Sequence, residues 1–223
     1  VLRRLMNPDR PVGRQEATAQ LQPVFSQSET HEFLHLALRD PMPQVRKATL
    51  EVARSLPKSV RVALLKTGLE EANADVVQAW SSFFSTLEPE QQIPLLVDQI
   101  SPGRPEAMRL SGFEAMETSE TLIASAVATD SLIELFANQK DPLHDRQAEL
   151  LAVSPRPEGT QALLSALGKV EEPLAVRDLA LSALIKQPAD VAVAKLVALT
   201  SSEPSEELRV KAADALVTHF CEE

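Results

Sequence analysis

The clearest chemical pattern in the chain is H-E-x-x-H at residues 31–35. On a helix this spacing places two imidazoles one turn apart beside a carboxylate, as a zinc hydrolase requires. The apolar residues of the same segment recur at helical spacing, as in an ordinary packed helix. No extended zinc motif follows, and Glu51 is the only nearby carboxylate that could complete the ligand set. We therefore expect a solvent-facing helix, no cofactor, and only adventitious metal capture by His31 and His35.

Other reactive side chains have no catalytic companions. His144 is expected in an inter-repeat loop and His219 in the last helix, and no Ser or Cys is spaced to partner either. The single cysteine, Cys221, is expected in a terminal turn and is a poor nucleophile candidate. Trp80 shares a helix face with two phenylalanines, which predicts a core position. A partly exposed Trp80 would instead be a binding hot spot for a protein partner. We expect no catalytic residue and no enzyme activity.

The elements that would position these residues come from an internal repeat. Residues 40–56 read D-P-M-P-Q-V-R-K-A-T-L-E-V-A-R-S-L, and related sequences recur along the chain. The aligned positions are separated by steps of 32, 31, 32, 37, 31 and 32 residues, and six of the seven hold arginine. These positions are Arg14, Arg46, Val77, Arg109, Arg146, Arg177 and Arg209.

The repeat predicts an all-α fold. Each unit reads as two helices of three to four turns with proline-marked junctions, and no stretch alternates convincingly as a strand. One hairpin cannot bury its apolar face alone, so stacked hairpins are expected to share a two-layer core. We predict six to seven repeats in a single array over residues 1–223. Because Val1 reads as the interior of a helix, the chain is expected to be a fragment or domain of a larger protein.

The recurring arginines are expected to be structural. They could reach acidic loop residues at neighbouring junctions, such as Asp40, Asp141 or Glu172, and form a ladder from repeat to repeat. As exposed pairs, each would contribute only about 0–1 kcal/mol. We therefore expect the ladder to set the register of the repeats.

The pattern D-P-x-P-x-V-R-x-A with a step of 31–32 residues resembles the HEAT-like repeats of the bacterial and phycobilin-lyase type. The resemblance covers essentially the whole chain, is weak near Gly13, and lacks the arginine at Val77. It implies a right-handed α-α superhelix, a HEAT/armadillo-like solenoid whose second helices line a concave surface. It implies no single activity, because members of this family include scaffolds, adaptors, chromophore lyases, an iron hydroxylase and DNA glycosylases. The hydroxylase uses several His-Glu pairs, whereas this chain has one.

The charge is uneven along the chain. Residues 1–110 carry 13 basic and 13 acidic residues, whereas residues 111–223 carry 9 and 19 and so account for the net charge of −10. An acidic half repels a phosphate backbone, so no nucleic acid is expected as a partner. The acidic residues either keep the array soluble or dock a basic protein. The docking candidates are Glu134, Glu158, Glu171, Glu172 and Asp190.

The function expected from these features is a non-enzymatic protein-interaction scaffold or adaptor that uses the concave face. The alternative is a HEAT-like lyase or chaperone for a chromophore-bearing protein, which rests on the family resemblance alone. No apolar run approaches the roughly 20 residues of a membrane span. The single cysteine fits a reducing compartment, so a cytoplasmic location is expected.

Overall fold

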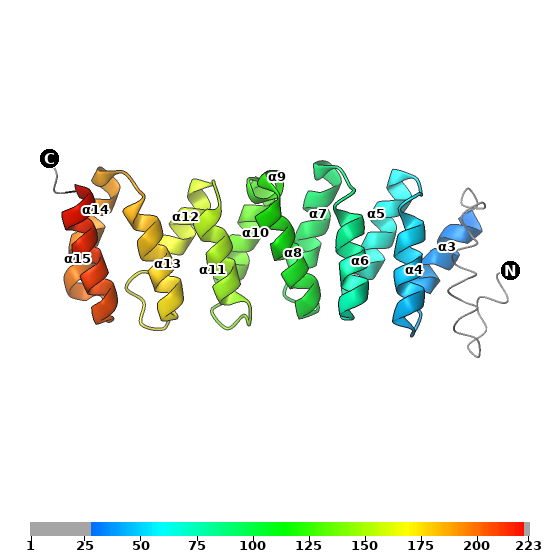
Figure 1. Cartoon of the computed structure of the whole chain (residues 1–223), viewed down its shortest axis with the longest axis horizontal. Coiled ribbons are helices and arrows are strands. Elements are labelled where there is room, and N and C mark those ends of the chain that lie inside the picture. Colours follow the sequence, from blue (N-terminus) through cyan, green and yellow to red (C-terminus); the bar gives the residue numbers. More distant parts are fainter. Residues whose placement is uncertain (1–27, 221–223) are drawn as a thin grey trace. The chain divides into compact units, whose positions relative to one another are not determined.

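The structure is a computed structural model that describes residues 28–220, and every regular element among them is a helix. The all-α prediction is therefore confirmed for these residues. The predictions for Gly13, Arg14 and Cys221 lie outside them. Figure 1 shows the elements, whose bounds are α3 Ser28–Ala37, α4 Pro43–Ala53, α5 Lys58–Thr67, the 3-10 helix η2 Gly68–Glu70, α6 Ala74–Phe84, α7 Pro89–Ile100, α8 Glu106–Thr118, α9 Glu120–Ile123, α10 Ala126–Phe136, α11 His144–Val153, α12 Pro157–Leu164, α13 Leu174–Ile185, α14 Ala189–Ser202 and α15 Glu206–Phe220.

The helix starts follow from local chemistry. Pro43, Pro89 and Pro157 occupy first-turn positions, where the missing N–H costs nothing and the fixed φ suits a helix. The side chains of Asn73 and Ser125 accept hydrogen bonds from backbone N–H groups in the first turns of α6 and α10. The junctions between helices are thus encoded by proline and capping residues.

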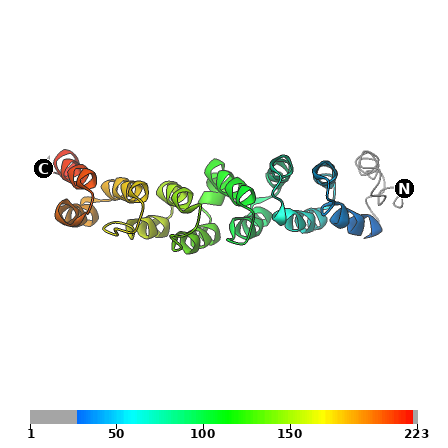
Figure 2. The ribbon, with the colours of Figure 1, turned by 90° about the horizontal axis from the view of Figure 1, so that it is seen from below.

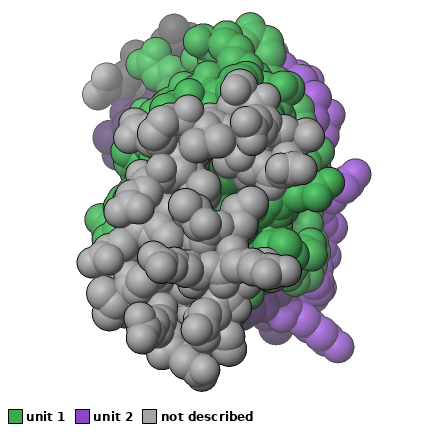
Figure 3. Space-filling view, turned by 90° about the vertical axis from the view of Figure 1, so that its right-hand side faces the viewer, with its two compact units in different colours: residues 1–122 green, residues 123–223 purple. Residues whose placement is uncertain are grey.

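The chain divides into two compact units, residues 1–122 and 123–223 (Figure 3). In unit 1, α4 packs against α6 and α6 against α8, while α3, α5 and α7 form a second series of neighbours. In unit 2, α11, α13 and α15 pack in sequence, α10 packs against α12, and α14 packs against α15. Within each unit the helices lie in two rows (Figure 2). None of the helices in residues 28–220 is long and apolar enough to cross a membrane.

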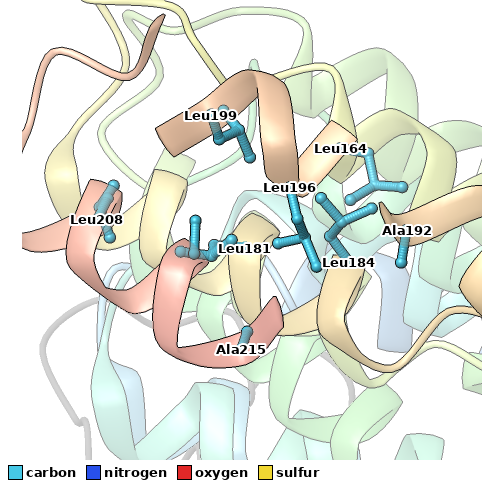
Figure 4. Packing of buried hydrophobic residues seen from close by; sticks show 9 residues of the cluster. Leu164, Leu181, Leu184, Ala192, Leu196, Leu199, Leu208 and Ala215 are labelled. Atoms are coloured by element: carbon cyan, nitrogen blue, oxygen red, sulfur yellow. The ribbon is translucent and has the colours of Figure 1, made fainter. Parts of the chain in front are cut away.

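The core of unit 2 is built mainly from leucine and alanine. Leu184, Ala192 and Leu196 are fully buried between α13 and α14, and α15 closes the cluster with one leucine and two alanines (Figure 4). Alanine lets these helices approach closely, while leucine fills the space between them. The full cluster is Leu164, Leu181, Leu184, Ala192, Leu196, Leu199, Leu208, Ala212 and Ala215.

The core of unit 1 is organised around Trp80. Its indole is completely buried, stacks on Phe84 with ring centroids 5.3 Å apart, and donates from Nε1 to the Leu65 carbonyl at 2.9 Å. Gly68, where α5 ends, lies so close that a Cβ there would be 2.8 Å from the indole Cδ1. Trp80 therefore belongs to the core, and the hot-spot alternative is wrong because the side chain is not exposed.

The repeat with the long step differs from its neighbours in the connection between its helices. The second helix normally begins 11 or 12 residues after the aligned position, but α10 begins at Ala126, 17 residues after Arg109. The extra residues form the short helix α9. Residues 129–131, whose Thr-Asp-Ser sequence is typical of a helix break or a new N-cap, instead lie inside α10, and Thr129 packs in its buried face.

Gly68→Ala is expected to lower the free energy of unfolding of unit 1 by about 1–3 kcal/mol, because a rigid indole must move to admit the methyl group. Urea denaturation followed by circular dichroism at 222 nm measures this change. Gly103→Ala is the matched control, since no heavy atom lies within 4 Å of a Cβ at that position. Equal stability of the two variants would contradict the close contact.

Candidate functional site

The aligned arginine on α4 joins two successive junctions of the repeat. The Arg46 guanidinium donates to both carboxylate oxygens of Glu71, at 2.5 and 2.9 Å, in the loop before α6. Its Nη1 also donates to the carbonyls of Asp40 and Pro41, at 2.8 and 3.2 Å, in the loop before its own helix. The Arg46 side chain therefore links the loop before α4 to the loop before α6.

The Glu71 carboxylate is held in its ionised form. Burial alone would raise its pKa, but hydrogen bonds from Arg46 and from the backbone N–H groups of Asn73 and Ala72 outweigh this effect and lower the pKa. The same hydrogen bond raises the pKa of Arg46. The side chains are only 16% and 8% exposed, so solvent screens the pair weakly.

Unit 2 contains a related but simpler pair, with a single contact between guanidinium and carboxylate. Arg177 on α13 forms an ion pair with Glu203, which lies in the loop before α15, and both side chains are buried. The following aligned arginine, Arg209, donates to the carbonyls of Glu203 and Pro204 at 2.8 and 3.1 Å. These distances nearly repeat those of Arg46 to its own loop. Glu203 therefore connects two consecutive aligned arginines.

A histidine occupies the corresponding place between α11 and α13. His144 Nε2 lies 2.9 Å from a carboxylate oxygen of Glu172, whose other oxygen accepts a hydrogen bond from the Gln139 amide at 2.6 Å. The His144 ring also stacks on Phe136, with centroids 4.6 Å apart. His144 is the first residue of α11 and is buried, so its prediction as a loop residue is wrong. Arg146 instead pairs with Glu149 on its own helix at 2.5 Å.

Where the aligned arginine is missing, its acidic partner is missing as well. Val77 stands at the aligned position of α6, and Gly103 stands 26 residues later, where the other pairs have a carboxylate. An ion pair with the acidic and basic residues exchanged links these two junctions. Glu70 in η2 supplies the carboxylate, and Arg104 in the loop before α8 supplies the guanidinium. Arg104 also donates from Nε to the Asp98 carbonyl at 3.1 Å. This reversed pair is more exposed than the Arg46 and Arg177 pairs.

The structure differs from the ladder prediction in the identity of the acidic partners and in their exposure. The carboxylates that pair with Arg46 and Arg177 lie 25 and 26 residues later, at the next junction; the Arg177 pair is buried and the Arg46 pair is partly buried. The estimate for exposed pairs does not apply to them. The sequence signal was present, because Glu71 and Glu203 each stand six residues before the next aligned position. The buried Arg109 donates from Nε to the Ile100 carbonyl at 3.0 Å, as part of the same set of junction contacts.

The H-E-x-x-H residues lie on α3. Thr67 donates its hydroxyl hydrogen to the Ala63 carbonyl at 3.2 Å, and His35 Nδ1 lies 2.8 Å from the same hydroxyl oxygen. Burial, followed by the charges of Arg39 and His31, lowers the pKa of His35. Among the described residues, no three His, Cys, Asp or Glu side chains are grouped closely enough to hold a metal ion.

The acidic docking candidates differ in exposure. Glu134, Glu158, Glu171 and Asp190 are exposed, on α10, on α12, in the loop before α13 and on α14 respectively. Glu172 is only 4% exposed and binds His144 and Gln139, so its prediction as a docking residue is wrong. The other four remain docking candidates.

Unit 1 also contains a groove that sequence reasoning did not find. It has a volume of about 550 Å³ and lies among the ends of α6 and α8, the start of α7, and α9. Phe84, Leu87 and Leu122 contribute buried apolar surface, while serine, threonine and glutamine contribute polar atoms. A volume of this size suits a small ligand or a large side chain. The groove could have been suspected from the long repeat, because Ser119 and Leu122 in its wall belong to the extra segment.

Glu71→Gln is expected to destabilise unit 1 at neutral pH, with a smaller effect in acid. The pKa of Glu71 is lower in the folded than in the unfolded chain, so ionisation adds stability above the ordinary glutamate pKa of about 4.3. This contribution is lost as the pH falls through the lowered pKa. Urea denaturation at several pH values from 7 to 3 measures the difference between wild type and variant. The control is Glu51→Gln, at an exposed position of α4. A difference that does not change with pH would contradict this assignment.

Arg177→Ala is expected to lower the stability of unit 2 by about 3–5 kcal/mol, because it leaves Glu203 buried without its cation. Arg156→Ala, which breaks a more exposed pair with Glu158, should cost only about 0–1 kcal/mol. Thermal and urea denaturation measure both values. The double variant Arg177→Met/Glu203→Gln should recover part of the loss. Equal effects of the two single variants would show that burial of the pair does not matter.

Comparison with known proteins adds no assignment. No protein-family model matches the chain, and no curated protein matches it. What the chain binds must therefore be inferred from its own residues.

Proposed function

We propose that the chain is a non-enzymatic interaction scaffold, built as one HEAT-like solenoid over residues 1–223. In this proposal six to seven hairpins form a right-handed α-α superhelix, and the second helices line a concave surface that binds a protein partner. The single cysteine favours a reducing compartment, and we place the scaffold in the cytoplasm.

The observation that carries the proposal is the recurring link between successive junctions. Arg46–Glu71 and Arg177–Glu203 occupy equivalent places in two different units, and each joins one hairpin to the next. Such links favour a regular stack over independent hairpins. A regular stack presents a long surface of second helices, on which many weak contacts can add up to specific binding.

The four exposed acidic candidates suggest the chemistry of the partner. Glu134, Glu158 and Asp190 lie on α10, α12 and α14, the second helices of unit 2, and Glu171 lies in the connecting loop. Carboxylates on one series of helices would attract a partner with a basic surface and accelerate its association. The proposed partner is therefore a protein with a basic binding face.

The test is affinity capture from the source cells, followed by measurement of the association rate of the captured protein at several salt concentrations. The triple variant Glu134→Lys/Glu158→Lys/Asp190→Lys is expected to slow association about tenfold at low salt, and higher salt should reduce the difference. The matched control, Asp145→Lys/Glu206→Lys/Asp214→Lys, makes the same charge change at exposed positions on the first helices.

The control also matches the helix positions. Glu158, Asp190, Asp145 and Glu206 all lie in the first turn of their helices, so both triple variants lose similar helix-dipole stabilisation. Equal association rates for wild type and both variants, independent of salt, would leave the acidic residues a solubilising role only. Loss of binding in the control variant alone would show that the partner binds the first helices instead of the second.

A further inference from the structure

We propose that the groove of unit 1 binds the guanidinium of an arginine side chain in a partner polypeptide. This inference rests on the proposed scaffold role and assigns a ligand chemistry to one site. The groove is the one with a volume of about 550 Å³, formed by α6, α7, α8 and α9. Its hydrogen-bonding character, charge and position in the repeat point to the same ligand.

The groove lies at the departure from the regular repeat. This repeat is five residues longer than the regular step of 32, and the segment between the end of α8 at Thr118 and the start of α10 at Ala126 contains α9, whose Leu122 lines the groove together with the preceding Ser119. In repeat proteins, insertions map to loops on one face, often the binding face. The extra segment thus makes a wall that the regular spacing would not provide.

The hydroxyl groups of the groove are oriented as acceptors. Ser81, Ser85 and Thr118 each donate their hydroxyl hydrogen to a backbone carbonyl of their own helix, at 2.9, 3.0 and 2.9 Å. Their oxygen lone pairs are therefore the groups left for a ligand. Gln92 donates one amide N–H to the Phe84 carbonyl at 3.1 Å, which leaves its amide oxygen and its second N–H for a ligand. Acceptors therefore outnumber donors among these four side chains, which favours a ligand rich in donors.

The charge of the groove is negative. Glu114 on α8 is exposed and is the only charged residue among those that line the groove. Glu120 on α9 is also exposed, beside the lining residue Ser119. Glu88, between the lining residues Leu87 and Pro89, lies 4.0 Å from Lys58. A cation is therefore favoured over a neutral or anionic ligand.

An arginine side chain combines the required properties. Its guanidinium has five N–H donors and no acceptor, and it pairs with a carboxylate in two parallel hydrogen bonds. Its methylene stem can lie against the groove wall, where Phe84, Leu87 and Leu122 line the site but are themselves almost fully covered. Lysine has fewer donors and a more strongly hydrated charge, so it fits the same acceptors less well.

The test uses N-acetyl-arginine-amide as the probe and two-dimensional ¹⁵N–¹H NMR of the whole chain as the readout. Saturable shifts are expected for the backbone amides of Ser85, Glu114, Thr118 and Ser119. N-acetyl-citrulline-amide, a neutral analogue of nearly the same shape, should produce much weaker shifts. Glu114→Lys should weaken binding of the arginine probe at least about fivefold, because the carboxylate is replaced by a like charge.

Glu51→Lys is the matched control, because Glu51 and Glu114 each stand five residues after an aligned arginine and both are exposed. It should leave binding unchanged. Ala115→Leu adds apolar bulk to the groove without changing charge and should also weaken the probe. Circular dichroism at 222 nm establishes that each variant is folded before its binding is compared.

Three outcomes would overturn the proposal. NMR shifts that are scattered over acidic surfaces, and that are equally large in wild type and Glu114→Lys, would indicate unspecific attraction of the arginine probe. Equal shifts with citrulline would show that the groove does not select a cation. Tighter, groove-specific binding of spermidine would make a free polyamine the ligand in place of a polypeptide. A captured partner that binds normally while the arginine probe fails would refute the groove and leave the scaffold proposal standing.

Discussion

The buried pair of an arginine with a glutamate from the next junction is the interaction on which the stacking of these hairpins depends. A guanidinium and a carboxylate can be buried only when each finds its partner at the correct distance and orientation. A neighbouring hairpin displaced by one helical position would leave both charges without partners. The apolar cores of alanine and leucine tolerate several packings, whereas the ion pair selects one. Stability and register are therefore supplied by different groups of residues.

The variations in this link are as informative as its repetition. At Val77 and Gly103 both members of the pair are absent together, and Glu70–Arg104 joins the same junctions in the opposite direction. Between α11 and α13, His144 and Gln139 share the carboxylate of Glu172. The requirement is thus a polar bridge between successive junctions, which different residue types can provide. Such a requirement leaves side chains elsewhere on the helices free to vary with the ligand.

The repeat pattern predicted the all-α class and most helix positions because period, proline and capping residues act locally. It did not predict which carboxylate each arginine would reach. Asp40 and Glu71 stand at the same place in successive junctions. Only the packing of α4 on α6 shows that Arg46 binds the carboxylate of Glu71 and the backbone carbonyl of Asp40. The groove was also not predicted, since its lining combines residues 81–92 and 111–122, which only the packing of α6, α7, α8 and α9 brings together. The charge count identified acidic residues but could not separate the buried Glu172 from the exposed Glu171.

The double role of Glu203 has a consequence for how unit 2 comes apart. Its side chain holds Arg177 in the preceding hairpin, while its carbonyl holds Arg209 in the helix that follows. Melting of either partner removes a hydrogen bond from the other, so neighbouring hairpins are coupled energetically as in a one-dimensional cooperative chain. In unit 1 we expect weaker coupling between α6 and α8, where the reversed Glu70–Arg104 pair is more exposed than the partly buried Arg46–Glu71 pair. Unfolding in such a chain spreads readily across strong couplings and pauses at weak ones, which makes the α6–α8 boundary a natural limit between cooperative folding segments.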